Sequence, residues 1–227
     1  MSKEKIEMMQ KEVDSLAKQI EEICKDDIEV NQLYLGTQIY FSPLQHQMDL
    51  MFLGINPGGG AYTYSGRKPR KTEPLEKSEY ETERYALQED WNIIFKDKEI
   101  NRIDLLYNGF KTNCSFIATK DSNSLKKLNR ILKEKYELDL NKKQAEFIKL
   151  LISYVGPKLI ICEGFSAFAT FRKMYTNNEF QMTDESEVCK IAYLNGKLPV
   201  LGFKRGIDSR FKDLDNVVDT LIDFLEE

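Results

Sequence analysis

The first 25 residues place apolar side chains at alternating spacings of three and four, with charged side chains between them. This is the period of an amphipathic helix, so the pattern predicts one helix over residues 3–25. Its apolar positions are Ile6, Met9, Val13, Leu16, Ile20 and Ile23. Such a stripe packs either on the rest of its own chain or on a second copy of the protein. Three heptads make a marginal coiled coil, which favours packing within the chain over self-association.

After residue 48 the pattern changes to short apolar runs that alternate with helical periods. The runs predict strands at residues 50–53, within 105–112, at 158–162 and at 198–203. Helical periods lie at residues 83–95, 124–136, 142–155, 166–175 and 213–226. Strands separated by helices predict an α/β fold whose mainly parallel sheet is covered on both faces.

The same pattern divides the chain into an N-terminal helix with a lead-in segment, residues 1–47, and an α/β domain, residues 48–227. Within that domain, residues 188–194 and 198–203 flank Asn195-Gly196, a dipeptide typical of a β-hairpin turn. In parallel sheets, ligands bind beyond the carboxyl ends of the strands. Four segments are expected to meet at that edge: residues 54–60, 112–116, 163–165 and 202–206.

Charge and histidine content narrow the classes of function. The chain has 33 Lys and Arg against 37 Asp and Glu, and this net charge of −4 argues against tight, non-specific DNA binding. Residues 1–49 hold 5 basic and 10 acidic side chains, so the remainder is nearly neutral and stays compatible with a nucleic-acid ligand. His46 is the only histidine, which excludes any metal site with two histidines. We expect no metal and no cofactor.

The cysteines and the hydropathy of the chain indicate the cellular compartment in which the protein is expected. The four cysteines lie far apart without a C-x-x-C pair, as is typical of reduced, buried thiols. No apolar stretch approaches the length of about 18 residues that a membrane helix needs. The N-terminus carries acidic residues and lacks the apolar centre of a signal peptide. These features predict a cytoplasmic protein with no membrane partner.

The most informative segment is Gly-Ile-Asn-Pro-Gly-Gly-Gly, residues 54–60, at the end of the first predicted strand. Its glycines allow a ligand to approach the backbone, and Pro57 fixes the chain direction after Asn56. We expect Asn56 to be held rigidly with its amide in the crevice. The segment matches neither G-x-x-x-x-G-K-[ST] nor G-x-G-x-x-G, so two other interpretations stay open: a strand-exit turn without chemistry, and an anion-binding turn of a hydrolase acting on a small phosphorylated compound.

The order of these motifs resembles the uracil-DNA glycosylase superfamily, over about residues 48–226. The GINPG segment is most similar to that of the mismatch-specific thymine/uracil branch, and KLIICEG, residues 158–164, matches a later strand in character. The resemblance implies a three-layer α/β/α sandwich with a four-stranded, mainly parallel sheet and no metal or cofactor. It implies hydrolysis of the N-glycosidic bond of a flipped uracil or mismatched base in DNA.

The resemblance also implies roles for individual residues. Asn56 would position the attacking water, and backbone groups near Ile55 and Gly58 would hold the base or its phosphate. Asn113 would read the amide edge of uracil, and an aromatic residue such as Tyr62, Tyr64 or Phe116 would stack on the base. Residues expected to contact phosphate or DNA are Gly59, Gly60, Arg67, Lys68, Lys204 and Arg205.

One motif departs from the family. Its members commonly carry a histidine after the fourth strand, where it stabilises charge on the leaving base. Here the corresponding segment is Gly-Phe-Lys-Arg-Gly-Ile, residues 202–207, which has no histidine. The alternative hypothesis is therefore a catalytically inactive relative that binds a nucleotide, a nucleic acid or a protein through the same crevice.

Overall fold

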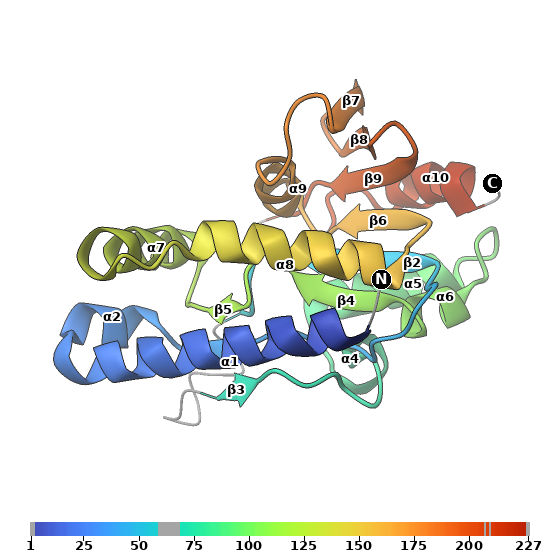
Figure 1. The fold of residues 1–227 in the computed structure, drawn as a ribbon. Helices are drawn as coiled ribbons and strands as arrows, with labels where there is room; N and C mark the ends of the chain where they lie inside the picture. Colours follow the sequence, from blue (N-terminus) through green and yellow to red (C-terminus); the bar gives the residue numbers. More distant parts are fainter. Residues whose placement is uncertain (1–2, 59–68, 207, 209, 226–227) are drawn as a thin grey trace. The chain divides into compact units, whose positions relative to one another are not determined.

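The computed structural model describes residues 3–58, 69–206, 208 and 210–225 (Figure 1). By their internal contacts these residues form two units, each assembled from separate stretches of chain. The first unit comprises Met1–Tyr40, Ile55–Pro74 and Asn113–Tyr154, and the second comprises Phe41–Gly54, Leu75–Thr112 and Val155–Glu227. The boundary expected at residue 47 rests on sequence pattern alone and stays a prediction.

The first unit is mainly helical. It contains α1 (Lys3–Asp26), α2 (Ile28–Leu33), α7 (Ser122–Tyr136) and nearly all of α8 (Leu140–Val155). Three short strands, β1 (Gly36–Gln38), β3 (Arg70–Lys71) and β5 (Ile117–Ala118), form a sheet in the order β3-β1-β5. Strands of two or three residues have no recognisable periodicity, which is why the sequence pattern did not predict them.

Helix α1 confirms the predicted amphipathic helix and extends over nearly the predicted range. Ile6, Val13 and Ile20 on its apolar stripe are buried within the single chain. On its polar side, Asp14 forms an ion pair with Arg70 of β3, with 3.3 Å between the carboxylate and the guanidinium. The apolar stripe of this helix therefore packs within its own chain, and self-association through the helix stays a prediction.

Asp27 connects α2 to α7. Its Oδ1 caps α2 by accepting hydrogen bonds from the backbone N–H groups of Glu29 and Val30, both at 3.0 Å. Its Oδ2 accepts from the Tyr136 hydroxyl at 2.9 Å and from Lys135 Nζ at 3.2 Å. The backbone hydrogen bond from Val30, followed by the one from Tyr136, lowers the pKa of Asp27 from 3.8 to about 2.

This lowered pKa predicts a specific dependence of stability on pH. Because the folded protein holds the charged form, Asp27 stabilises the fold above the ordinary carboxyl pKa of 3.8, and the effect is lost as pH falls through about 2. We expect Asp27→Asn to be less stable than the wild type at pH 6 and nearly equal to it near pH 2. Denaturant unfolding at several pH values measures this difference. Asp26→Asn, at an exposed neighbouring position, is the control, and an equal pH trend in both variants would contradict the assignment.

The second unit is built on a sheet that has six strands in the described part of the chain, in the order β4-β2-β6-β9-β8-β7. Strands β2 (Leu50–Gly54), β6 (Leu159–Cys162) and β9 (Leu198–Phe203) are parallel neighbours. Strand β4 (Phe110–Asn113) borders β2. Strands β8 (Cys189–Leu194) and β7 (Phe180–Glu185) continue the sheet beyond β9 in antiparallel pairs. The mixed α/β class with a mostly parallel sheet is therefore confirmed.

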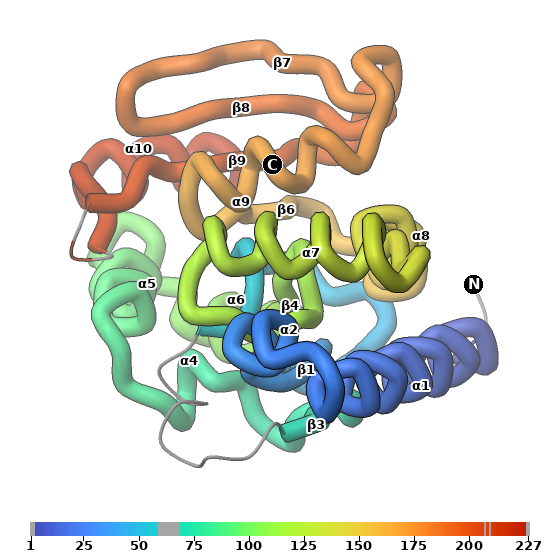
Figure 2. Tube along the Cα trace, turned by 90° about the vertical axis from the view of Figure 1, so that its left-hand side faces the viewer, coloured from blue at the N-terminus to red at the C-terminus, as the bar shows by residue number. Residues whose placement is uncertain are grey.

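The expected number of four strands is wrong for this sheet. The four predicted strands are neighbours, but the predicted hairpin pairs β8 with β9, and β7 then pairs with β8 (Figure 2). The hairpin turn itself is as predicted, since Asn195 and Gly196 both have positive φ, at 53° and 67°. Strand β7 follows a polar segment and is mostly exposed, and it ends in three polar residues, so it lacks the sustained apolar alternation that would have predicted it.

One face of this sheet packs against α5 (Ala86–Lys96), α6 (Ile103–Tyr107) and α10 (Leu214–Leu225). Alternate strand residues such as Phe52, Ile161 and Leu201 point to this face. Trp91 of α5 is fully buried there, and its ring lies 4.7 Å from that of Phe211 and 5.4 Å from that of Phe52. The tryptophan is thus a core residue of the second unit.

The other face packs against α9 (Phe165–Arg172) at β6 and β9. The contact is close because Gly202 of β9 has no side chain: a Cβ there would lie 2.6 Å from Cδ2 of Phe168. Phe168 is itself buried, with its ring 5.4 Å from that of Phe180. Glycine is required at this position by packing rather than by backbone conformation.

Gly202→Ala is therefore expected to lower the free energy of unfolding by about 1–3 kcal/mol, the usual cost of inserting a methyl group into a packed core. Gly58→Ala is the matched control, because a Cβ at residue 58 would meet no atom of the described residues within 4 Å. Denaturant titration of both variants measures the difference. Equal stability of the two variants would show that α9 moves away from β9 at little cost.

The strand expected within residues 105–112 is found, but it occupies only the second half of that range. Its first half is the end of helix α6, and the strand begins only at Phe110, after Gly109. Leu105 and Leu106 are buried by the helix rather than by the sheet. A short apolar run does not distinguish a buried helical turn from a strand, and here the glycine separates the two.

Candidate functional site

Asn56 lies in the turn that follows β2 and is held by hydrogen bonds within the first unit. Its Nδ2 donates to the Pro57 carbonyl at 3.0 Å, to Thr119 Oγ1 at 3.0 Å and to the Ile117 carbonyl at 3.5 Å. The Thr119 hydroxyl in turn donates to the Asp121 carbonyl at 2.8 Å. The amide nitrogen of Asn56 is thus already hydrogen-bonded, whereas its Oδ1 accepts no hydrogen bond from any described residue. The hydrogen bonds of Nδ2 thus hold the side chain with Oδ1 as its remaining acceptor.

A second segment is tied to the same turn. The backbone N–H of Ser115 donates to the Ile55 carbonyl at 2.8 Å, and the Ser115 hydroxyl accepts from Gln144 Nε2 of α8, also at 2.8 Å. Asn113 precedes this contact by two residues and is 7% exposed. Across the described ranges its amide group has no hydrogen-bond partner. The structure therefore brings the Asn56 turn and the segment after Asn113 together.

The other residues expected near the base occupy different environments. Ile55 is half-buried, and its carbonyl is used by Ser115, while Gly58 is exposed with open space around its Cα. Phe116 is 4% exposed, and its ring packs edge-on against that of Phe147 at 6.4 Å between centroids. This ring is part of the core of the first unit.

Several expected site residues lie outside the described part of the chain. These are Gly59, Gly60, Tyr62, Tyr64, Arg67 and Lys68. Their expected contacts with a base, a phosphate or DNA stay predictions.

The second unit contains a group of ionised side chains that the sequence did not reveal. Lys111 of β4 is buried, and its Nζ lies 2.6 Å from Glu79 Oε1 and 3.1 Å from Glu163 Oε1. The same Nζ lies 2.8 Å from the Tyr85 hydroxyl and 4.1 Å from the centre of the Tyr80 ring. We call Glu79, Lys111 and Glu163 the buried charge cluster.

Glu163 is the best-connected member of this cluster. It follows β6 directly and is 5% exposed. Its Oε1 accepts hydrogen bonds from the Tyr80 hydroxyl, from Trp91 Nε1 at 3.1 Å and from Lys111 Nζ. Its Oε2 accepts none from the residues that the structure describes. One carboxylate oxygen is saturated, and the other is left without a donor.

Electrostatics favour the charged forms of Glu163 and Lys111. Burial by itself raises the pKa of Glu163, but the charge of Lys111, the Tyr80 hydrogen bond and the charge of Arg205 together bring that pKa below its usual value. Burial likewise opposes the charge of Lys111, and Glu163 and Glu79 outweigh it, so the pKa of Lys111 is raised. Lys111 is therefore a permanent cation and not a nucleophilic amine.

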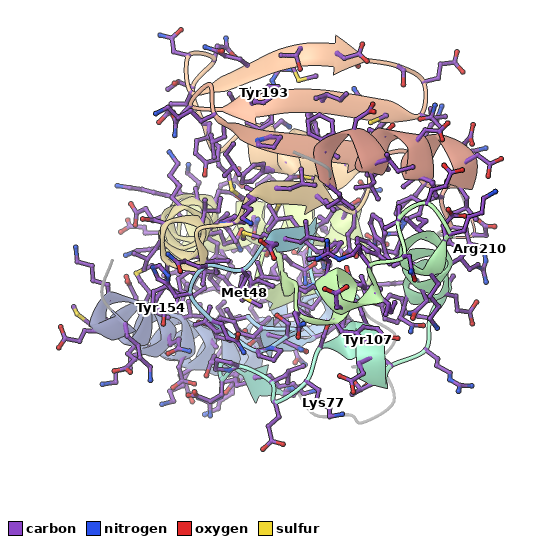
Figure 3. The ribbon with its side chains drawn as sticks, turned by 90° about the vertical axis from the view of Figure 1, so that its right-hand side faces the viewer. Met48, Lys77, Tyr107, Tyr154, Tyr193 and Arg210 are labelled. Carbon is purple, nitrogen blue, oxygen red and sulfur yellow. The ribbon has the colours of Figure 1, made fainter. Side chains whose placement is uncertain are left out.

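The basic residues after β9 differ in the contacts they make. Arg205 Nη1 donates to the Glu163 carbonyl at 3.3 Å, and its stem crosses Gly164, where a Cβ would come within 3.3 Å of Arg205 Cδ. Arg210 lies at the outer side of α5 (Figure 3), with its Nη1 2.6 Å from Asp90 Oδ1. Lys204 is half-buried and forms no ion pair with a described residue. Lys204 and Arg205 thus follow β9 at the edge where Glu163 follows β6, as expected for parallel neighbours.

The sequence alone could have indicated this cluster in one respect. Lys111 stands in a strand whose four residues are all buried, and Glu163 directly follows the apolar run 159–162. A charge in such a place needs a partner, but the pattern does not show which one. The partner residue Glu79 lies in α4 (Glu79–Thr82), a four-residue helix that the sequence did not predict.

Over the described ranges there is no group of three His, Cys, Asp or Glu side chains that would hold a metal ion. None of the described helices has both the length and the apolar character needed to span a membrane. The chain matches no protein-family model and no curated protein.

Proposed function

We propose that the protein hydrolyses the N-glycosidic bond of a flipped uracil or mismatched base in DNA, with Asn56 positioning the attacking water. The observation that carries this proposal is the state of Asn56: its Nδ2 is bound to Thr119, Pro57 and Ile117, and its Oδ1 is left as an acceptor. This side chain follows a strand of a mostly parallel sheet, on the side where such sheets bind ligands.

In the proposed hydrolysis, the main task of Asn56 is to orient the attacking water. A water molecule that donates one hydrogen bond to Asn56 Oδ1 keeps a lone pair free to attack C1′ of the sugar. As the C1′–N bond breaks, its electron pair leaves with the base, which then takes up a proton, while the water loses a proton to solvent. Asparagine is a poor base and does not accept that proton, so turnover is expected to be slow.

Asn113 is proposed to read the base. The Asn113 amide makes no hydrogen bond to a described residue, so its donor and its acceptor are both available to a ligand that supplies the matching groups. The edge of uracil supplies both, at N3–H and at the neighbouring carbonyl. This match supports uracil over a base whose edge is blocked by methylation.

The order of the strands in the sheet also supports the proposed glycosylase function. The four strands expected from the resemblance, β4, β2, β6 and β9, are consecutive neighbours in the sheet. In this proposal they correspond to the four-stranded sheet of an α/β/α sandwich, and β8 and β7 are an addition at its margin. Lys204 and Arg205 follow β9 in the second unit, and their expected contact with a leaving base or a phosphate stays a prediction.

A second candidate function is binding without hydrolysis. The segment after β9 has no histidine, and Arg205 is turned back onto the Glu163 carbonyl. Both facts weaken stabilisation of the leaving base, and neither affects Asn56 or Asn113. Under this alternative the protein binds DNA or a nucleotide and releases no base.

The test is a base-release assay with enzyme in excess over oligonucleotide. The substrates are single strands containing uracil and duplexes containing U:A, U:G or T:G. The proposal predicts release of free base from at least one of them. Salt-sensitive binding without release would favour the second candidate, and neither binding nor release would contradict both.

A further inference from the structure

Gln144 is the polar member of the buried face of α8. The apolar members of that face within the first unit recur at helical spacing and are Leu140, Phe147, Ile148 and Leu151. Gln144 follows the same spacing, and only 4% of its surface is exposed. A buried amide in such a place is unfavourable unless it is hydrogen-bonded. Its Nε2 donates to the Ser115 hydroxyl at 2.8 Å, so this contact offsets the cost of burying it.

The Ser115 hydroxyl accepts two hydrogen bonds. Besides the one from Gln144 Nε2, it accepts from the backbone N–H of Ile117 in β5, at 3.2 Å. The backbone N–H of the same serine donates to the Ile55 carbonyl at 2.8 Å. Ser115 is 2% exposed, which shields these hydrogen bonds from competing water. Ser115 therefore connects α8 both to β5 and to the turn that follows β2.

Both backbone partners of Ser115 lead to Asn56. Ile55 precedes Asn56 directly in the chain, and the Ile117 carbonyl accepts from Asn56 Nδ2 at 3.5 Å. The direction of the Asn56 side chain thus depends on where residues 115–117 lie. All the residues of this connection belong to the first unit, so it needs no contact with the second.

We infer that Gln144 is a positioning residue: through the Ser115 hydroxyl it holds residues 115–117 in place and thereby fixes the direction of Asn56 Oδ1. This inference rests on the proposed function and adds to it a residue that acts through others rather than by contact with the substrate. A displacement of about 1 Å at a reacting group costs up to roughly 100-fold in rate, so one remote hydrogen bond has a measurable effect.

The first experiment observes Asn56 in the free protein and needs no base release. In isotope-labelled protein, the NMR signals of the Asn56 Nδ2 protons are identified by their absence from Asn56→Asp. Their exchange with solvent reports how firmly the amide is held. Gln144→Leu keeps nearly the size of the side chain and lacks the donor to Ser115. We expect it to speed this exchange roughly tenfold, about the effect of one lost hydrogen bond.

Two further variants make this experiment specific. Ile148→Val is the matched control, because it changes the packing of the same face of α8 and leaves Gln144 in place, so exchange should stay at the wild-type rate. Ser115→Ala removes the hydroxyl through which Gln144 acts, so adding Gln144→Leu to it should cause no further acceleration. Thermal unfolding verifies that each variant is folded. Wild-type exchange in Gln144→Leu, or additive effects in the double variant, would overturn the inference.

The second experiment measures base release under single-turnover conditions. At saturating protein, Gln144→Leu is expected to lower the rate by roughly tenfold with an unchanged Kd for the oligonucleotide, because the residue orients Asn56 and does not hold DNA. Ile148→Val should release base at the wild-type rate.

These outcomes separate the inference from the proposed function. Base release that depends on Asn56 but is equally fast in Gln144→Leu and in the wild type would leave the function standing and remove the role of Gln144. Faster exchange in Gln144→Leu, without base release by the wild type, would show that Gln144 holds Asn56 and would contradict hydrolysis.

Discussion

Lys111→Met is expected to lower the free energy of unfolding by about 3–5 kcal/mol, because it leaves the buried Glu163 carboxylate without its cation. The methionine side chain has nearly the volume of the lysine stem, so a loss of packing does not explain such a cost. The Nζ contact with the Tyr80 ring at 4.1 Å is lost at the same time. Chemical denaturation at pH 7 measures the effect.

The double variant Lys111→Met with Glu163→Gln separates charge from packing. It removes both buried charges and is expected to recover a large part of the lost stability. The destabilisation by Lys111→Met should also shrink as pH falls. The pKa of Glu163 is lowered in the wild type, so its stabilisation is present above the unfolded carboxyl pKa and is lost in acid. A single variant as unstable at low pH as at neutral pH, with no recovery in the double variant, would show that the cost is not electrostatic.

Asn56→Ala is expected to reduce base release by about 10²- to 10³-fold with little change in DNA affinity, since the residue orients water rather than holding DNA. Thr119→Val tests the hydrogen bond that holds Asn56. Without the Oγ1 acceptor at 3.0 Å, the amide is free to turn, and an intermediate loss of roughly tenfold is expected.

Asn123→Ala, at an exposed asparagine of α7 in the same unit, is the matched control and should release base at the wild-type rate. Single-turnover kinetics at saturating protein separate the rate of the chemical step from binding. A Thr119→Val variant that matches Asn56→Ala would indicate that Thr119 contacts the substrate itself. An Asn56→Ala variant with wild-type rate would remove the proposed mechanism.

The sequence predicted those parts of the fold that have a clear period or a specific turn. The apolar stripe of α1, the runs that form β2, β6 and β9, and the Asn195-Gly196 hairpin all follow from local patterns. The two-residue strands β3 and β5 and the four-residue helix α4 have no such pattern. They are fixed by contacts with distant parts of the chain, which periodicity does not report.

In the candidate site, too, local sequence patterns do not report contacts between distant residues. Asn56 was singled out because its neighbours are glycines and a proline, and the structure adds the partners that hold it, Thr119 and Ile117. The buried charge cluster joins residues 79, 111 and 163, which are far apart in the sequence. Lys111 and Glu163 each stand next to apolar residues, and only the three-dimensional fold shows that they pair.

The central claim is that Asn56 positions the water that cleaves a glycosidic bond, and release of free base tests it most directly. The measurement is quantification of free uracil and thymine after single-turnover incubation of the uracil and T:G oligonucleotides with wild-type protein and with Asn56→Ala. The account predicts release by the wild type, and at least a hundredfold less by Asn56→Ala at equal DNA occupancy, about the effect of removing one preorganised group. Equal release by the two proteins, or none by wild-type protein that has bound the DNA, would contradict it.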